Sequence, residues 1–254
     1  MRRIFYTIAD VNNLKYFVKL KNSLAKFHLQ EELRLFDDLA IQNSQDPMFF
    51  YRATPILAKK LMDEGYDMVC KLDCDQIITG DLSHIWEGDF DVAVVQNSNP
   101  REMKTYPVAV WDIPPLDYLN CGFVVMKSKK FVEHWLSLCY SPHFDHYQMK
   151  EQDLLNILVY YGDYKVKFLD RSNKWHNLIS KGYWSKIELR DIGIIDGKFR
   201  DFKLVLPKND EWPQDEDKQI ACLHWAGGND PRKMEDINIK FKPEVAKWLN
   251  DLIK

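Results

Sequence analysis

The sequence predicts an α/β fold in which a mostly parallel mixed sheet is flanked by helices. Short apolar runs alternate with amphipathic helical segments, and the run at 67–73 is almost continuously apolar. A strand of that kind is typical of a parallel sheet that is covered on both faces. The length of 254 residues also suits one large domain. We therefore expect a single domain over residues 1–254.

The first half of the chain supplies the opening strand, a helix and the central strand. A short β-rich run at 3–10 leads into a polar loop and a helix. The next helix is expected to begin at Thr54, a plausible N-cap before Pro55, and to end at Gly65. It leads into the strand at 67–73.

Later segments continue the alternation. Strands are expected at 91–96 and 122–127, and helices at 129–140, 148–162 and 242–254. The last helix carries an apolar stripe, which favours packing on the domain over membrane binding because surface helices carry this pattern routinely.

Composition excludes several classes of protein. The net charge is −3 and the basic residues are scattered, so no nucleic-acid partner is expected. The five cysteines lack a CxxC pair, which indicates reduced core residues instead of disulfides or a zinc site. Without a signal peptide or a membrane-spanning run, we expect a cytoplasmic protein with at most peripheral membrane contact.

Two aspartates, Asp73 and Asp75, follow the central strand. Side chains of an extended chain alternate, so this pair lies on one side and can share a divalent cation. Ligands of open α/β sheets bind at the carboxyl ends of the strands, where the pair is expected. The alternative is a turn in which one aspartate caps the next helix.

The stretch "LHWAGGNDPRK" near the C-terminus supplies possible companions. His224 can be a third metal ligand through a neutral imidazole, or else a hydrogen-bonded core residue. Gly227, Arg232 and Lys233 offer the backbone N–H groups and cations that a phosphate needs.

Together these stretches resemble the GT-A glycosyltransferases, specifically family 8, the galactosyl, glucosyl and glycogenin-like group. The resemblance covers residues 3 to about 235 and rests on "FYTIAD", "RATPILAKKLMDEGYDMVCKLDCDQIITGDL", "LNCGFVVMK", "EQDLLN" and "HWAGGNDPRK". The sequence departs from the family where Glu151 replaces an Asp and Trp225 replaces a Phe, and where "GGNDPRK" only approximates Gly-x-x-Lys-Pro-Trp.

The resemblance implies a single GT-A (Rossmann-like) domain, with a nucleotide-binding half at about 1–96 and an acceptor and metal-closing half at about 97–254. It implies metal-dependent transfer of a hexose-type sugar from a UDP-sugar to a glycan or another hydroxyl acceptor, with retention at the anomeric carbon. The cation would be Mn²⁺ or Mg²⁺, held by Asp73, Asp75 and His224.

The resemblance also assigns roles to single residues. Thr7, Ala9 and Asp10 would bind uracil and ribose, although a strand end and a helix cap explain them equally well. The expected catalytic residues are Gln152, Asp153 and Glu151, with a solvated helix charge as the alternative for Glu151. The remaining substrate-binding candidates are Arg52, Lys60, Asp73, Asn120, Gly122, Gly227, Arg232 and Lys233.

Rival functions stay open at this point. An inverting transferase of the same fold needs a carboxylate base, which Glu151 or Asp153 could supply. A non-catalytic sugar-nucleotide or glycan-binding relative is a second alternative. A haloacid-dehalogenase-type phosphatase is disfavoured because Ile77 replaces the Thr or Val of that motif and no second aspartate pair ends a later strand. A sugar nucleotidyltransferase is also disfavoured, because no glycine-rich loop with Arg and Lys follows the first strand of this sequence.

Overall fold

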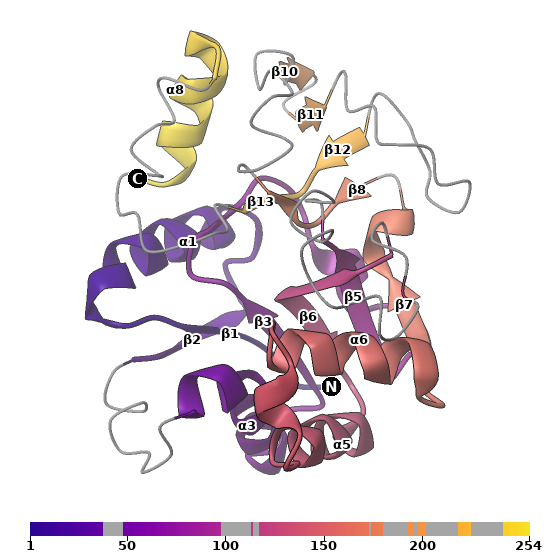
Figure 1. The fold of residues 1–254 in the computed structure, drawn as a ribbon. Coiled ribbons are helices and arrows are strands. Elements are labelled where there is room, and N and C mark those ends of the chain that lie inside the picture. Colours follow the sequence, from indigo (N-terminus) through magenta and orange to yellow (C-terminus); the bar gives the residue numbers. More distant parts are fainter. Residues whose placement is uncertain are drawn as a thin grey trace.

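A six-stranded sheet lies at the centre of the protein (Figure 1). The computed structural model describes residues 1–37, 48–97, 113, 117–172, 174–179, 193–195, 198–201, 218–224 and 241–254. The strand order is β2-β1-β3-β6-β5-β7, and β6 is antiparallel to both neighbours while the other neighbouring pairs are parallel. This confirms the mostly parallel mixed sheet. The strands are β1 (Arg3–Ile8), β2 (Glu32–Phe36), β3 (Met68–Leu72), β5 (Val92–Gln96), β6 (Leu119–Met126) and β7 (Val166–Phe168).

Helices cover both faces of this sheet (Figure 1). Because side chains alternate along a strand, Tyr6 and Val69 pack on one face, in a core that includes buried residues of α3, α5 and α6. Phe5 and Cys70 pack on the other face with residues of α1 and η2. The helices are α1 (Leu14–Phe27), α3 (Phe49–Asp63), α5 (Lys129–Cys139), α6 (Glu151–Tyr161) and α8 (Pro243–Leu252), with short 3₁₀ turns η1 (Val11–Asn13), η2 (Ser83–Trp86), η4 (Phe144–His146) and η5 (Leu169–Arg171).

Two smaller sheets complete the described part of the fold. One has the order β10-β11-β12-β8 and the other β4-β13-β9. Their strands are β4 (Gln76–Ile78), β8 (Lys174–Trp175), β9 (Leu178–Ile179), β10 (Gly193–Ile195), β11 (Lys198–Asp201), β12 (Lys218–Ile220) and β13 (Cys222–His224).

Helix α3 starts earlier than its sequence predicts. Its N-cap is Met48, and Pro55 lies inside the helix instead of at its first position. The buried face of α3 already includes Ala53, so packing against the sheet outweighs the local capping signal of Thr54. The predicted end at Gly65 is confirmed: its φ of +90° lies in the left-handed region that favours glycine.

The C-terminal helix packs on the domain, as expected. Val245 and Leu249 of α8 are buried, and Asn22 of α1 donates to the carbonyl of Ile253 at 3.1 Å. No helix in the described ranges has the length and apolar character needed to cross a bilayer. All five cysteines are free; Cys74 and Cys121 are half-buried and the other three are buried.

The topology brings distant residues to one edge of the central sheet. Strands β1 and β3 are parallel, so the loops after both begin at this edge. Strand β6 runs the other way and pairs Phe123 with Leu72, which places its N-terminal residues there too. The sheet contains strands from both expected halves of the chain, since β6 and β7 follow residue 97. Most of the functional candidates lie at this edge.

Candidate active site

Asp73, Asp75 and His224 form a group that could hold a metal ion, with one ligand atom from each lying within 4.8 Å of the others. His224 Nε2 is 3.3 Å from Asp73 Oδ2 and 3.2 Å from Asp75 Oδ1. The antiparallel pairing of β13 with β4 places His224 opposite Gln76 and so beside the aspartate pair. Two carboxylate oxygens and one imidazole nitrogen suit a divalent cation such as Mn²⁺.

Asn177 orients the imidazole of His224. Its Oδ1 accepts from His224 Nδ1 at 2.7 Å, which leaves Nε2 facing the two carboxylates. Such outer partners fix the ring and tautomer of metal-binding histidines. Burial disfavours a charged imidazole, but Asp75 and Asp73 more than offset this and raise the pKa of His224 to about 9. The position therefore favours a positive charge, which a cation can supply in place of the proton.

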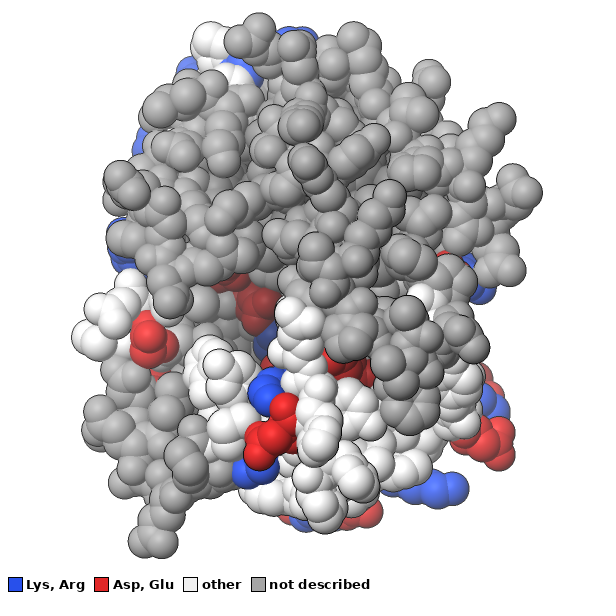
Figure 2. All heavy atoms as spheres, in the orientation of Figure 1, with Lys and Arg blue, Asp and Glu red and all other residues white. Residues whose placement is uncertain are grey.

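A cleft of about 300 Å³ adjoins this group. On the face drawn in Figure 2, acidic side chains lie recessed in a hollow of the surface. The cleft combines residues that follow β1, residues that follow β3 and the start of α6. Its lining consists of Ile8, Ala9, Asp10, Asn13, Phe50, Thr54, Lys71, Asp73, Cys74, Asp75, Cys121 and Glu151.

The residues predicted from the first strand divide into two sets. Ala9 and Asp10 line the cleft, whereas Thr7 is fully buried and does not line it. Asp10 Oδ1 accepts from the backbone N–H of Asn13 at 2.9 Å and from its side-chain amide at 2.7 Å. Asp10 thus caps the turn η1, as the alternative explanation expected, and it also lines the cleft.

Glu151 projects into the cleft from the first residue of α6. Burial raises the pKa of its carboxyl to about 8. Glu151 is half-buried in the wall of the cleft, so it is not a fully solvated helix charge. Its Oε1 lies 3.9 Å from Cys121 Sγ, which also lines the cleft.

Gln152 and Asp153 do not line the cleft. Gln152 joins α6 to β6, and Asp153 binds residues that lie just before these two elements. Gln152 Oε1 accepts from Asn120 Nδ2 at 3.3 Å and from the backbone N–H of Cys121 at 3.1 Å. Asp153 accepts from the Tyr118 hydroxyl at 2.6 Å and from the backbone N–H of Met149 at 2.9 Å. Both carboxylate oxygens of Asp153 are thus engaged, while the amide of Gln152 fixes the start of α6 against β6.

Arg52 and Lys60 are not brought to the cleft. Arg52 Nε donates to the Cys139 carbonyl at 2.8 Å, and the guanidinium lies 4.8 Å from the ring centre of Tyr140. The ammonium of Lys60 lies 5.7 Å from the ring centre of Phe36. The other predicted phosphate contacts, Gly227, Arg232 and Lys233, lie outside the described residues.

Gly122 lies against the metal-binding candidates. A Cβ on this residue would lie 2.5 Å from Asp73 Oδ2 and 2.7 Å from His224 Cε1. The backbone N–H of Gly122 donates to Asn120 Oδ1 at 2.8 Å, and its carbonyl accepts from the N–H of Asp73. Glycine is therefore required by close approach at this position.

Sequence reasoning missed several residues of the site. Lys71 and Cys121 line the cleft, and Asn177 and Tyr118 hold predicted residues in place. A lysine inside the apolar run "VCKLD" is a detectable signal, because a buried strand rarely carries a charge without a partner. Asn177 gave no local signal, since its contact with His224 depends on the pairing of β9 with β13.

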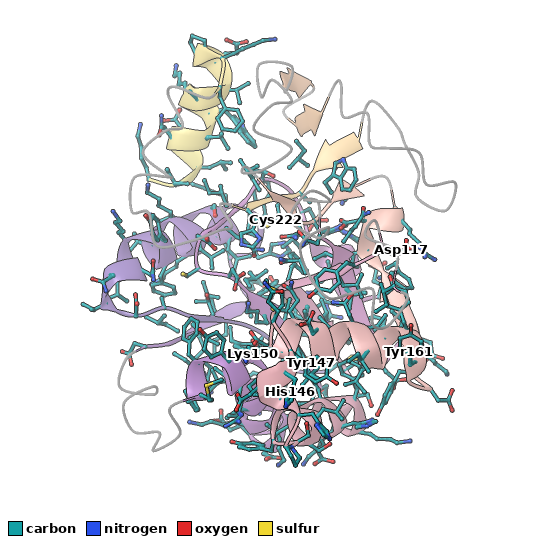
Figure 3. All side chains as sticks on the ribbon, in the orientation of Figure 1. Asp117, His146, Tyr147, Lys150, Tyr161 and Cys222 are labelled. Atoms are coloured by element: carbon teal, nitrogen blue, oxygen red, sulfur yellow. The ribbon has the colours of Figure 1, made fainter. Side chains whose placement is uncertain are left out.

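Lys150 holds a strained backbone immediately before Glu151, with φ of 50° and ψ of −121°. Figure 3 labels it at the start of α6, next to Tyr147 and at the other end of the helix from Tyr161. We expect Lys150→Gly to be more stable than Lys150→Ala by about 1 kcal/mol, because glycine adopts this conformation without a Cβ clash. Urea unfolding of the two variants measures this.

Exposed Glu133 in the middle of α5 is the matched control. There the order should reverse, with Glu133→Ala more stable than Glu133→Gly, because glycine weakens an ordinary helical position. Equal stability of the two Lys150 variants would show that the backbone at Lys150 is not strained.

The comparisons with known proteins agree with this architecture. The sequence model of glycosyl transferase family 8 matches residues 3–231. The structure is similar to the WbbM bifunctional glycosyltransferase (TM-score 0.58, 15% identity, covering 98% of this chain and 51% of WbbM). It is also similar to the galactosyltransferase LgtC, with a TM-score of 0.54 and 16% identity, covering 98% of this chain and 94% of LgtC. A third similar structure is a glycosyltransferase involved in glycosylation of the major capsid of PBCV-1, with a TM-score of 0.55 and 10% identity, covering 94% of this chain and 100% of that one.

None of the curated proteins matches the chain, and it spans about half of WbbM. The structural neighbours confirm the GT-A fold, because two of them cover nearly the whole of both chains. The family match extends over most of the sequence and includes the strand that ends in Asp73 and Asp75. The chain therefore belongs to glycosyl transferase family 8.

Proposed function

We propose that the protein transfers a hexose-type sugar from a UDP-sugar to a hydroxyl group of a glycan or another acceptor, and that it requires Mn²⁺ or Mg²⁺. The observation that carries this proposal is the group of Asp73, Asp75 and His224 beside the cleft. Family membership supports the reaction class. LgtC, which has the same fold, has been crystallised with donor and acceptor sugar analogs, which supports a two-substrate cleft.

Each side chain has a distinct part in the proposed reaction. Asp73, Asp75 and His224 would hold the cation, which would supply positive charge to offset the negative charge that develops on the departing diphosphate. Asp10 faces the cleft and accepts a hydrogen bond from a ribose hydroxyl. Gln152, through Asn120 and the backbone of Cys121, fixes the start of α6 so that Glu151 projects toward the donor sugar.

A panel of nucleotide sugars tests the proposal. Hydrolysis and transfer are measured with UDP-, GDP-, ADP- and CMP-sugars, each with Mn²⁺ and with excess chelator. We expect one or a few UDP-sugars to be consumed, and only when the cation is present. If none of these donors is hydrolysed or transferred at high enzyme concentration, the proposed transferase activity is ruled out.

Transfer is predicted to proceed with retention at the anomeric carbon. An inverting enzyme needs a carboxylate base facing the acceptor. Asp153 has both oxygens engaged and does not line the cleft, and the raised pKa of Glu151 favours its protonated form at neutral pH. Gln152 does not line the cleft, and its amide is too weak a base in any case. These observations support retention.

Proton NMR of the earliest product from an α-linked UDP-sugar measures the stereochemistry. An α-linked product agrees with the prediction. A β-linked product would contradict it and would identify Glu151 as the first candidate for the base, to be tested with Glu151→Gln.

A further inference from the structure

Strand β3 carries a lysine at a position where the sheet is otherwise apolar. Lys71 is 4% exposed and pairs with Tyr6 of β1 and Val124 of β6. It lies two residues after Val69, so both side chains project from the same face of the sheet. A buried ammonium costs much free energy unless it is paired. The ammonium of Lys71 therefore requires a negatively charged or hydrogen-bonding partner.

The ammonium of Lys71 lies between β3 and β6. It contacts Asp73 Oδ1, and it donates to the Cys121 carbonyl at 3.0 Å. The other oxygen, Asp73 Oδ2, lies 3.3 Å from His224 Nε2. The two oxygens of Asp73 thus have different partners: one faces the lysine and the other faces the metal-binding group.

The contact between Lys71 and Asp73 joins two groups of opposite charge. The side chain of Lys71 is buried and that of Asp73 is half-buried, and the ammonium lies against Oδ1 of the carboxylate. Removing one partner of a buried ion pair is costly, because the other charge is left without compensation. Oδ1 of Asp73 is therefore held by an ion pair.

The cleft is otherwise acidic. Of its described lining residues, Lys71 is the only lysine or arginine, against the four carboxyl groups of Asp10, Asp73, Asp75 and Glu151. A nucleotide diphosphate is itself an anion and would be repelled by uncompensated carboxylates. A fixed ammonium close to Asp73 reduces that repulsion even before the cation adds its charge.

We propose that Lys71 is a positioning residue, which holds Oδ1 of Asp73 so that only Oδ2 is offered to the cation, and whose positive charge favours the anionic donor over the bare cation. This inference rests on the proposed function, because it requires a divalent cation and a nucleotide diphosphate in the same cleft. The competing explanation is an ion pair that serves only to stabilise the fold.

The two explanations predict different signs for a neutral side chain at this position. Loss of the ammonium removes its repulsion of the bare cation and frees Oδ1 of Asp73 as a second ligand atom, so Mn²⁺ alone should bind more tightly. The same loss removes a positive charge near the diphosphate, so the nucleotide should bind more weakly. A purely structural ion pair predicts that both affinities fall together.

The experiment uses Lys71→Met, which removes both the charge and the donor that holds Oδ1 of Asp73, with Lys71→Gln as a second neutral variant that removes only the charge. Electron paramagnetic resonance of free Mn²⁺ gives the affinity for the cation alone. Calorimetry with UDP at saturating Mn²⁺ gives the nucleotide affinity. We expect Mn²⁺ to bind at least about threefold more tightly and UDP at least about threefold more weakly than in the wild type.

Two controls separate charge from packing. Lys71→Arg retains the charge, so its affinity for Mn²⁺ should not rise. Lys59→Gln removes a lysine that pairs with Asp63 on the helix surface, away from the cleft lining, and should change neither affinity. Circular dichroism reports whether each variant is folded.

Parallel weakening of both affinities, no change in either, or loss of the folded state in both neutral variants would overturn the inference in favour of a structural role. If the wild type binds Mn²⁺ and UDP while the neutral variants give one of these three results, only the positioning role of Lys71 is disproved and the proposed function stands. If the wild type binds neither, the proposed function fails with it.

Discussion

An Asp75→Asn variant and a His224→Ala variant should each lose cation-dependent turnover by about 100-fold or more while remaining folded. Each change removes one of the three groups whose ligand atoms lie within 4.8 Å of one another. A cation held by these three groups would stabilise charge in the transition state, so the loss should appear in kcat and persist at saturating donor. Initial rates with the preferred UDP-sugar, measured over a range of Mn²⁺ concentrations, check this.

Asp89→Asn is the matched control for Asp75→Asn. Asp89 is exposed, pairs with Lys165 at 2.6 Å and does not line the cleft, so its amide variant should keep wild-type turnover. Full activity in either Asp75→Asn or His224→Ala would disprove the metal assignment.

Gly122→Ala is expected to reduce turnover by about 100-fold, an effect typical of groups displaced by about 1 Å. The new methyl group would lie 2.5 Å from Asp73 Oδ2, 2.6 Å from Asn120 Oδ1 and 2.7 Å from His224 Cε1. These atoms belong to candidate metal and sugar contacts, so their displacement should weaken Mn²⁺ binding together with the rate. Mn²⁺ titration and initial rates of the variant measure both effects.

Gly162→Ala is the control for Gly122→Ala. Its Cβ would lie 2.4 Å from the Leu158 carbonyl at the end of α6, so it should also destabilise the protein, by about 1–3 kcal/mol. It does not line the cleft, so the folded Gly162→Ala protein should bind Mn²⁺ normally. An equal loss of Mn²⁺ affinity in the two variants would attribute the effect of Gly122→Ala to general destabilisation.

The sequence predicted the elements whose signals are local. The apolar run before Asp73 indicated a buried parallel strand, and Gly65 and Gly162 marked the ends of α3 and α6. The acidic pair could be recognised because its spacing and its place after that strand are both visible in a few consecutive residues. Local patterns of this kind require no knowledge of the rest of the fold.

Contacts between distant segments could not be predicted in this way. The distance between His224 and Asp75 depends on the antiparallel register of β13 and β4, which the family resemblance suggested but no periodicity specifies. Arg52 was expected at the substrate, yet its guanidinium packs against Tyr140 because the ends of α3 and α5 meet. Thr54 looked like an N-cap, but burial of the preceding turn extends the helix past it.

The central claim is that Asp73, Asp75 and His224 hold a divalent cation against a nucleotide diphosphate. Anomalous diffraction at the manganese edge, from crystals grown with Mn²⁺ and UDP, tests it most directly. We predict one strong anomalous peak within coordination distance of all three side chains and adjacent to the diphosphate. UDP bound in the cleft with no peak at these residues, or with the manganese held elsewhere, would contradict the account.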